Sequence, residues 1–366
     1  MTGPVVTGAS AVTALGRDLA TTRAALAVGR SAVLPVESPD LPDRTDHSPA
    51  ARIAAFTPEP EIPKMKARRL DRASQYAVVA ARQVLADAGY AMTGREERTG
   101  ILLGTSSAGS GPLVEFERQM ALDGPEAASP FLFPYTVANA PASVTAIELQ
   151  IRGPNVTIMQ RDSAALNALL YARLMLERGR ADGLLVGAAD EWNLDCHLAY
   201  ERIHATRTEK RPGFVLGEGA AWLLVEEEGS ARARGAVLRA RVASVVTRPA
   251  AVPPYARRAD PEHLAAALRA ALDEAAIGAS AVGLIHLSRN GAPGTDEAEA
   301  RAIEQVFPSP PRMAAVKEAL GEHAFAGAVQ MALAVAELSD RPETGAVLVN
   351  GFSAGGNFSC AVLSRS

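Results

Sequence analysis

Short apolar runs alternate along the chain with longer segments in which apolar residues recur at helical spacing. The apolar runs are nearly continuous, which is typical of strands that are buried on both faces. They span residues 100–104, 155–159, 184–187, 220–225, 239–246, 282–287, 346–350 and 359–363. The helical segments span residues 71–88, 162–178, 261–276, 295–306 and 324–338. This alternation predicts an α/β protein whose sheets are covered by helices.

One strand–helix–strand order occurs twice, which indicates a duplicated fold. Its first copy runs through residues 156–159, 162–178 and 184–187, and its second through residues 314–316, 324–338 and 347–350. Irregular composition marks residues 34–63, 192–213 and 248–260. The last of these stretches is the expected boundary, so we expect one half at residues 1–247 and the other at 248–366.

Composition narrows the possible classes of protein. The chain has 366 residues with 48% hydrophobic content, enough for a large core, and a formal net charge of −4. It has no long basic run, so we expect no nucleic-acid partner. The basic residues within 64–72 are typical of a solvated helix entrance, or at most of a contact for an acidic partner. The sequence contains no apolar run long enough to cross a bilayer and no leader-like start, so we expect no membrane contact and a cytoplasmic location.

The two cysteines give no sign of a metal centre. Cys196 and Cys360 form neither a metal-ligand spacing nor a disulfide framework, and the six histidines are scattered. We therefore expect no metal and no cofactor.

Six segments resemble, in the same order, those of the ketosynthase branch of the thiolase superfamily. They are VVTG with LG at 5–8 and 15–16, ARRLDR with QYA at 67–72 and 75–77, RGPN at 152–155, GFVLGEGA at 213–220, DEAEA at 296–300, and NGF with GGN at 350–352 and 355–357. The stretch at 213–220 is the most specific of these matches. The resemblance implies a five-layer αβαβα thiolase fold with two pseudo-repeated halves. It also implies a dimer in which strand 155–159, including Val156 and Ile158, pairs with its partner-chain equivalent.

The positions at which the family carries its catalytic groups hold other residues here. A ketosynthase places a cysteine at a helix N-terminus, where the helix dipole favours the thiolate. Counting without gaps puts Asp162 at that position, and Asp is a favoured N-cap for the helix that follows. Counting also puts Ser288 and Glu322 at the two histidine positions. These changes predict that the chain has no catalytic residues of its own.

Two histidines and one loop residue lie near these positions. His286 precedes Ser288 by two residues, and a core or strand-end histidine is the plainer interpretation. His323 follows Glu322, and a shift of one residue in this short loop would restore it to the family position. The aromatic residue of the family's gating loop is replaced by Ala354.

The chain keeps the family's motifs but has other residues at the cysteine and histidine positions. In this it resembles the chain length factors of type II polyketide synthases. Those subunits lack the cysteine and pair with an active partner. The resemblance implies a heterodimer with a cysteine-bearing ketosynthase subunit and an acyl carrier protein that carries the growing chain. Because Asp162 differs from the Gln common in aromatic-polyketide members, the sequence favours a pair that builds polyene-type chains.

The segment at 108–120 occupies the position at which such subunits close the elongation tunnel. Ser110, Leu113 and Phe116 are the tunnel-lining candidates, although the same spacing is typical of an ordinary amphipathic helix. Phe133 and Tyr135 follow on a segment that resembles the family's interface, and core packing is the alternative interpretation.

Two other functions fit the sequence. The chain could be a malonyl-carrier-protein decarboxylase or atypical acyltransferase in its own right that uses Asp162, His286 or His323, since decarboxylation needs groups that bind a thioester carbonyl rather than a nucleophile. It could also be a scaffold for carrier proteins without control of chain length.

Overall fold

The computed structural model describes residues 3–37, 41, 46–250, 258–353 and 355–366. Its main sheet has ten strands in the order β11-β10-β12-β13-β9-β1-β8-β6-β4-β5. The strands are β1 Val5–Thr13, β4 Thr99–Thr105, β5 Asn155–Met159, β6 Gly183–Asp190, β8 Gly219–Glu226, β9 Ala240–Pro249, β10 Val282–His286, β11 Arg312–Ala314, β12 Ala346–Ser353 and β13 Asn357–Ser364. A small second sheet contains β2 Val33–Leu34, β3 Ala50–Ala51 and β7 Leu216–Gly217.

The helices cover both faces of this sheet. The α-helices are α1 Leu19–Ala27, α2 Lys64–Ala67, α3 Arg72–Asp87, α4 Ser110–Asp123, α5 Ala140–Leu149, α6 Ala164–Glu177, α7 Leu194–Arg202, α8 Glu228–Ala233, α9 Pro261–Ala275, α10 Pro293–Val306, α11 Lys317–Leu320 and α12 Ala324–Asp340. The 3₁₀ turns are η1 Pro125–Ala127, η2 Phe133–Tyr135, η3 Arg161–Ser163 and η4 Ala279–Ala281.

The two ends of the sheet repeat one strand order. Read from the outer edge inward, the first is β5-β4-β6-β8-β1 and the second is β11-β10-β12-β13-β9. The two sets meet through a short antiparallel pairing in which Val5 and Val6 of β1 face Arg241 and Ala240 of β9. The expected duplication is therefore present in the strand topology. The boundary expected between residues 247 and 248 falls inside β9.

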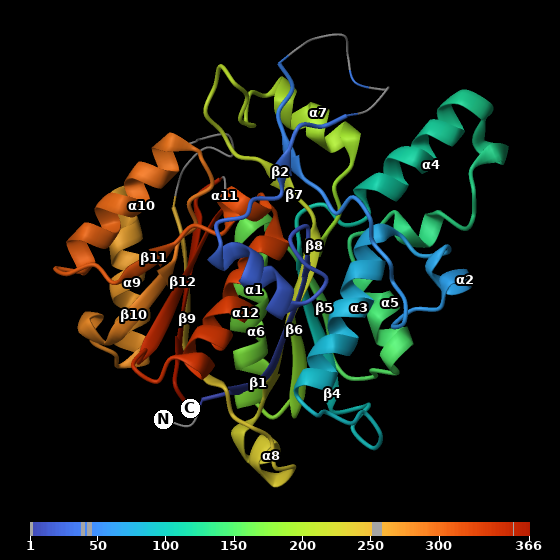
Figure 1. The fold of residues 1–366 in the computed structure, drawn as a ribbon. Coiled ribbons are helices and arrows are strands. Elements are labelled where there is room, and N and C mark those ends of the chain that lie inside the picture. The colour runs from blue at the N-terminus through green and yellow to red at the C-terminus, as the bar shows by residue number, and fades with distance from the viewer. Residues whose placement is uncertain (1–2, 38–40, 42–45, 251–257, 354) are drawn as a thin grey trace.

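The layers follow from which helices pack on which strands. α3 and α5 cover the outer face of the first strand set, and α9 packs on β9 and β13 of the second, with α10 against α9. α6 and α12 lie between the two sets, since α6 contacts β4, β6 and β9 while α12 contacts β8, β6 and β12 (Figure 1). The expected five-layer αβαβα fold is confirmed.

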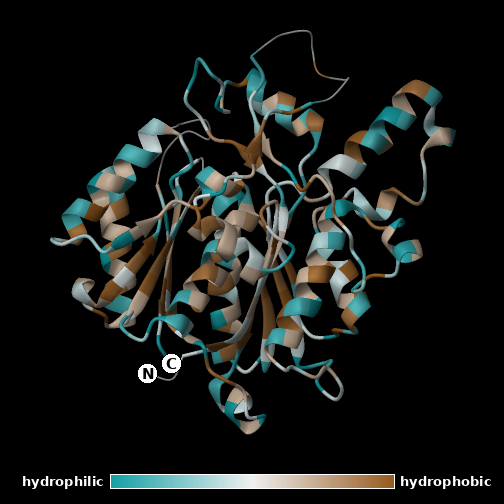
Figure 2. Cartoon of the chain, in the orientation of Figure 1, coloured by the Kyte–Doolittle hydropathy of each residue, from teal (hydrophilic) through white to brown (hydrophobic). Residues whose placement is uncertain are grey.

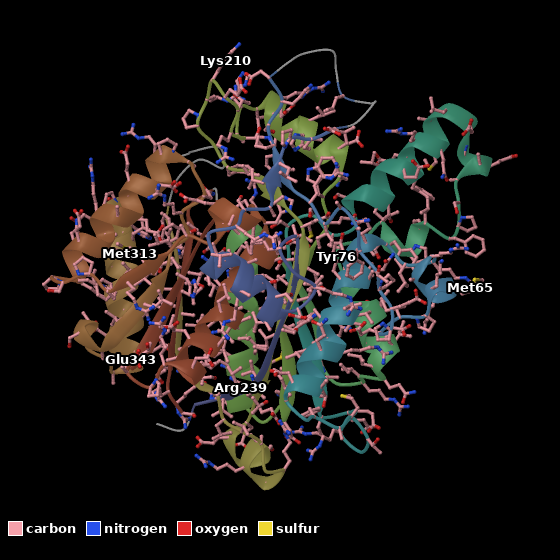
Figure 3. The ribbon with its side chains drawn as sticks, viewed as in Figure 1. Met65, Tyr76, Lys210, Arg239, Met313 and Glu343 are labelled. Atoms are coloured by element: carbon pink, nitrogen blue, oxygen red, sulfur yellow. The ribbon has the colours of Figure 1, made fainter. Side chains whose placement is uncertain are left out.

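The apolar pattern explains why the central layer can be so close to both strand sets. Figure 2 shows hydrophobic residues concentrated on the strands and on the helix faces that touch them. In α12, twelve of the residues are buried, and many of them are alanine or glycine, so that the helix fits between two sheets. Figure 3 shows the contrast at the outer layer, where Tyr76 points inward from α3 while Met65 lies at the periphery; Tyr76 is 0% and Met65 70% exposed.

Some local expectations need correction. The stretch at 192–213, expected to be irregular, contains helix α7, which begins after Asn193 because the Asn193 side chain accepts a hydrogen bond from the Cys196 amide. Residue 354, where the loop departs from the family's aromatic gate, lies outside the described residues, as do 251–257 of the expected boundary stretch. Within the described residues, no helix is long and apolar enough to cross a bilayer.

Candidate functional site

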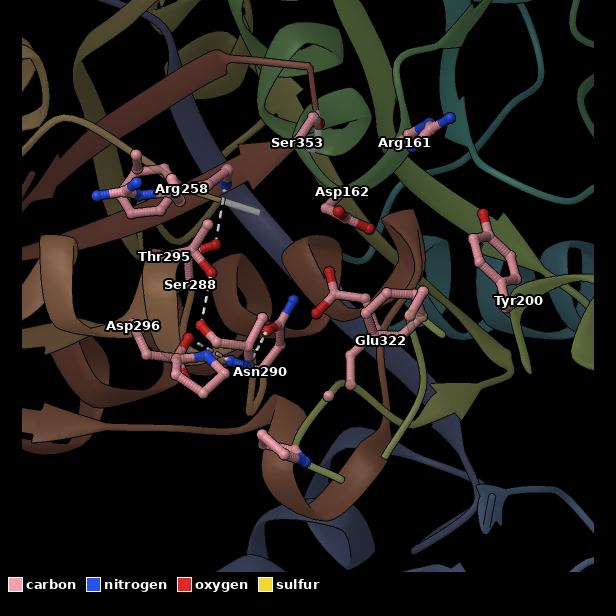
Figure 4. Close-up of a pocket in the computed structure, with 18 of the residues that line it drawn as sticks. Arg161, Asp162, Tyr200, Arg258, Ser288, Asn290, Thr295, Asp296, Glu322 and Ser353 are labelled. Carbon is pink, nitrogen blue, oxygen red and sulfur yellow. Dashed lines mark hydrogen bonds between the residues drawn. The ribbon is translucent and has the colours of Figure 1, made fainter. Parts of the chain in front are cut away.

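A cavity of about 490 Å³ opens where the N-terminal ends of the two central helices approach the loops that follow β10 and β12. Asp162 reaches it from η3, Ser288 from the segment after β10, and Glu322 and His323 from the residues before α12. Figure 4 shows Asp162, Ser288 and Glu322 around this space. The three positions identified by counting along the sequence are thus brought together, although they are up to 160 residues apart.

The backbone around Asp162 differs from the expected cap. Asp162 lies inside η3, and Ser163 is the residue that precedes the first turn of α6, so the prediction that Asp162 caps this helix is wrong. Ser163 N–H instead donates to the hydroxyl of Ser353 at 2.9 Å, and Ser353 donates in turn to the Gln160 carbonyl at 2.6 Å. With this helix end satisfied by a serine, the Asp162 carboxyl group points into the cavity (Figure 4).

A buried ion pair lies beside Asp162. Lys317 Nζ donates to Glu322 Oε1 at 2.8 Å, and it lies 3.4 Å from Ser288 Oγ. Lys317 is 2%, Glu322 3% and Ser288 5% exposed. The Ser288 hydroxyl also accepts a hydrogen bond from the Phe352 amide at 2.9 Å, which ties this group to the end of β12. Ser288 therefore helps to hold the loop and the lysine in place.

The electrostatics of this cluster follow from burial and from the second carboxyl group. Burial raises the pKa of Glu322 well above its usual range, and the charge of Asp162 raises it further, against the opposing effect of Lys317. Burial lowers the pKa of Lys317, but the Glu322 and Asp162 carboxylates outweigh it, so that this pKa is raised. Glu322 Oε2 has no hydrogen-bond partner among the described residues. The cluster therefore consists of an ammonium group beside two carboxyl groups, of which the buried Glu322 has a raised pKa that favours its neutral form.

A second buried carboxyl group supports the segment that carries Ser288. Glu299 on α10 accepts hydrogen bonds from the Ser288 amide at 2.9 Å, the Arg289 amide at 3.0 Å and the Asn350 side chain at 2.8 Å. Burial raises the pKa of Glu299 to about 7. Sequence reasoning noted the acidic stretch 296–300 only as a family motif, and the structure shows its positioning role.

The two histidines near the catalytic positions occupy different environments. His323 is 3% exposed, has a φ of 151°, and lines the cavity, and its Nδ1 has no hydrogen-bond partner among the described residues. His286 is the last residue of β10 and does not line the cavity. Burial lowers the pKa of His286 to about 4. This environment is that of a core histidine, whereas the imidazole of His323 is in reach of a molecule in the cavity.

No thiol lines the cavity within the part of the chain that the structure describes. The lining contains neither Cys196, which lies on α7, nor Cys360, which is buried in β13. Burial also raises the pKa of Cys360, which disfavours its thiolate. A carboxyl group cannot form the thioester exchange of a ketosynthase, so the cavity lacks the nucleophile for acyl transfer.

Three guanidinium groups and an aromatic wall complete the lining. Arg161, Arg211 and Arg258 contribute the cations, and Phe214 and Phe352 are part of the apolar side. Tyr200 stands opposite Asp162 (Figure 4), and burial together with the Asp162 charge raises the pKa of Tyr200 to about 12. Sequence reasoning missed these arginines, because they lie in irregular segments with no periodic pattern.

The tunnel candidates lie apart from this cavity. Ser110, Leu113 and Phe116 are on α4, which has no buried residue, and none of the three lines the cavity. Leu113 is 39% exposed, and the ring of Phe116 lies 5.8 Å from that of Phe133. An ordinary amphipathic helix would bury its apolar face against the core, and α4 buries no residue within this chain.

The interface candidates lie on or next to an open edge of the sheet. β5 pairs with β4 and is the last strand in the order, so its other side has no strand partner within the described residues. Val156 and Ile158 are half-buried against the core, whereas Met159 is 64% exposed. Phe133 in η2 is 62% exposed and Tyr135 is half-buried, so Phe133 is not packed in the core. An open edge beside exposed apolar residues is typical of a surface that another chain covers.

Comparison with known proteins identifies relatives along the whole chain. The model for the N-terminal domain of beta-ketoacyl synthases matches residues 4–231, and the model for their C-terminal domain matches residues 240–342. A 3-oxoacyl-[acyl-carrier-protein] synthase 2 from Staphylococcus aureus is 29% identical over 324 residues, covering 83% of this chain and 78% of the relative. The corresponding protein of Synechocystis sp. is 28% identical over 347 residues, covering 88% of this chain and 77% of the relative.

Solved structures show the same fold. The ishigamide ketosynthase/chain length factor superposes with a TM-score of 0.90 at 25% identity, covering all of both chains. A ketosynthase bound to a hexaketide, in complex with a type II polyketide synthase acyl-carrier protein, superposes with a TM-score of 0.87 at 20% identity, again covering all of both chains.

Proposed function

The chain belongs to the beta-ketoacyl synthase family, and from that premise we propose that it is a non-catalytic chain length factor of a type II polyketide synthase. The observation that carries this proposal is the cavity at the family's catalytic position. It holds Asp162 beside Glu322 and Lys317, and its described lining includes no thiol. A structural relative described as a ketosynthase/chain length factor supports the same assignment.

The proposed partner is a ketosynthase subunit that carries the cysteine. The open edge of β5 and the exposed Phe133 offer a surface on which a second chain of this fold can add a strand and bury apolar area. An acyl carrier protein would deliver the growing chain to the pair, which we place in the cytoplasm. The Asp at position 162 leads us to propose a polyene-type product.

The proposed mechanism is steric. The growing chain leaves the partner's cysteine and enters a tunnel at the interface, where Ser110, Leu113 and Phe116 of α4 form part of the wall. Because α4 packs on little of its own chain, its apolar residues are free to face the partner. The size of those side chains then sets how many extension units the tunnel accepts.

The test is the product length made by the reconstituted pair. Leu113→Trp fills the tunnel and is expected to shorten the products by one or more extension units. Met313→Trp is the matched control, because Met313 is also exposed but lies on β11, at the opposite edge of the sheet from β5. If product length is unchanged in both Leu113→Trp and Phe116→Trp, this chain is better described as a scaffold for carrier proteins without control of chain length.

A second candidate function is decarboxylation of a malonyl-carrier protein by this chain alone. The unpartnered Nδ1 of His323 lines the cavity and would be the group that binds a thioester carbonyl. Release of carbon dioxide by the purified chain, lost in His323→Ala and kept in His286→Ala, would favour this function.

A further inference from the structure

Helix α4 projects from the molecule (Figure 1, upper right) and has no buried residue. Its main contacts are with α7 and with η1 and η2, which lie in the segment that follows it. The helix begins after Gly109, which has a φ of 81° and offers no side-chain cap. Hydrogen bonds to its first turn therefore help to set the direction of the helix.

The fixing group is the buried side chain of Glu191, which directly follows β6. Its Oε1 accepts a hydrogen bond from the Gly111 amide in the first turn of α4, at 3.0 Å. The Asp71 carboxyl group, which caps α3, raises the pKa of the same side chain. Glu191 is 4% exposed, so the first turn of α4 is bonded to a buried side chain that directly follows a strand of the main sheet.

The surroundings of Gly111 are shaped to this contact. A Cβ at position 111 would lie 2.8 Å from Glu191 Oε1, so a side chain there would push the two apart. Two further hydrogen bonds connect the start of α4 and the residues before it to the segment after β6. Asn193 Nδ2 donates to Ser110 Oγ at 2.7 Å, and Ser107 Oγ donates to the Glu191 carbonyl at 2.9 Å.

The ionisable groups around Glu191 come from two parts of the chain. Asp71 and Arg72 are at the start of α3, Tyr76 is one turn further along it, and Glu218 directly precedes β8. Arg72 lies 3.7 Å from Glu218 and hydrogen-bonds Tyr76. Burial raises the pKa of Glu191 to about 8, and the charges of Asp71 and Glu218 add to this effect. The neutral form of the side chain is favoured, and in either form Oε1 accepts the hydrogen bond from Gly111.

We propose that Glu191 is the positioning residue for α4, and that through this helix it determines which chain lengths the pair makes. The inference rests on the proposed function, because only then is α4 a tunnel wall. Glu191 touches neither Leu113 nor Phe116 in this role; it sets the direction of the helix that carries them. A small tilt at the first turn moves both side chains.

The test compares two changes at position 191 in the complex with the partner ketosynthase. Glu191→Asp shortens the side chain by one methylene group, so its carboxyl group no longer reaches the Gly111 amide. We expect a broader distribution of product lengths and about tenfold faster amide hydrogen exchange at residues 111–116. Glu191→Gln keeps an oxygen for the Gly111 amide and offers its NH₂ group to Asp71, so it is expected to preserve both measurements.

A second variant approaches the same contact from the helix. Gly111→Ala places a Cβ against Glu191 Oε1 and is expected to broaden the product lengths as Glu191→Asp does, which keeps the test open if Glu191→Asp does not fold. Glu226→Asp is the matched control, since Glu226 is equally buried and bonded to Arg234, but at the far end of β8. It is expected to lower stability without altering product length.

Unchanged product lengths and unchanged exchange in both Glu191→Asp and Gly111→Ala would overturn the inference. If Leu113→Trp shortens the products in the same assay, the proposed function survives that result. If Leu113→Trp is also without effect on length, the proposed function fails, and faster exchange in α4 would then show only that Glu191 fixes the helix.

Discussion

Two carboxyl groups, Asp162 and Glu322, point toward each other across the cavity, with the ammonium group of Lys317 2.8 Å from Glu322. A ketosynthase needs a thiolate at the first of these positions and an imidazole at the second. Burial and the neighbouring Asp162 carboxyl group raise the pKa of Glu322, and the neutral form that this favours is compatible with burial. The Lys317–Glu322 pair and the Ser288 hydroxyl form a buried polar cluster that connects the loops around the cavity.

The raised pKa of Glu322 predicts a pH-dependent effect of Asp162→Asn on stability. The folded-state pKa of Glu322 is raised, so the native chain loses stability as pH rises above about 4.5 toward that pKa. The amide introduced by this substitution would donate to Glu322 and remove the repelling charge. We expect urea unfolding at pH 8 to show Asp162→Asn more stable than the natural chain by about 1–2 kcal/mol, with a smaller gain at pH 5. A gain that is larger at pH 5 would contradict the influence of the Asp162 charge on Glu322.

Counting along the family motifs places Asp162, Ser288 and Glu322 in the sequence, and the structure brings all three to one cavity. Asp162 does not cap α6, as the sequence predicted, because residues 161–163 form a 3₁₀ turn. Ser163 is therefore the residue at the N-cap position of α6. The Lys317–Glu322 pair and the support from Glu299 depend on side-chain directions in loops. Periodicity carries no information about those directions.

At the level of helices and strands, the open edge of β5 and the neighbouring turn η2 form a surface that the chain itself leaves uncovered within its described residues. Continuous apolar runs predicted the strands because both of their faces are buried. The polar composition of 192–213 concealed α7, whose nine residues have only a weak apolar stripe. For α4 the sequence left a tunnel wall and an ordinary amphipathic helix as alternatives, and α4 has no buried residue.

This surface predicts that Phe133→Asp weakens the proposed heterodimer. A charge at the centre of an apolar contact loses the burial of an aromatic ring and leaves an unpaired carboxylate, so we expect the dissociation constant to rise by about 30-fold or more. Analytical ultracentrifugation with the partner measures it. Val237→Asp is the control, because Val237 is 75% exposed and lies between α8 and β9. An unchanged affinity in Phe133→Asp would show that the partner binds elsewhere.

Across both halves, α6 and α12 pack on strands of the two sets at once, so neither half has a complete core by itself. The cavity lies at the N-terminal ends of these shared helices, which explains why residues from both halves line it. The alternation and repetition in the sequence were sufficient to predict these layers. The packing between the halves follows from the small residues of α12, which gave no separate signal.

The shared layer predicts that the chain unfolds in one transition. Both tryptophans, Trp192 and Trp222, lie in the first half, so their fluorescence reports on that half, whereas far-ultraviolet circular dichroism reports on all helices. In urea the two signals are expected to change at the same midpoint. Separate midpoints would show that the halves fold independently.

Covalent acylation distinguishes a non-catalytic subunit from an enzyme. The complex of this chain with the proposed ketosynthase partner is incubated with acylated carrier protein, and the mass of each subunit is measured by intact-protein mass spectrometry. We predict an acyl adduct on the cysteine-bearing partner and none on this chain, because its cavity presents Asp162 where a thiolate would be needed. A covalent acyl group on this chain would contradict that assignment.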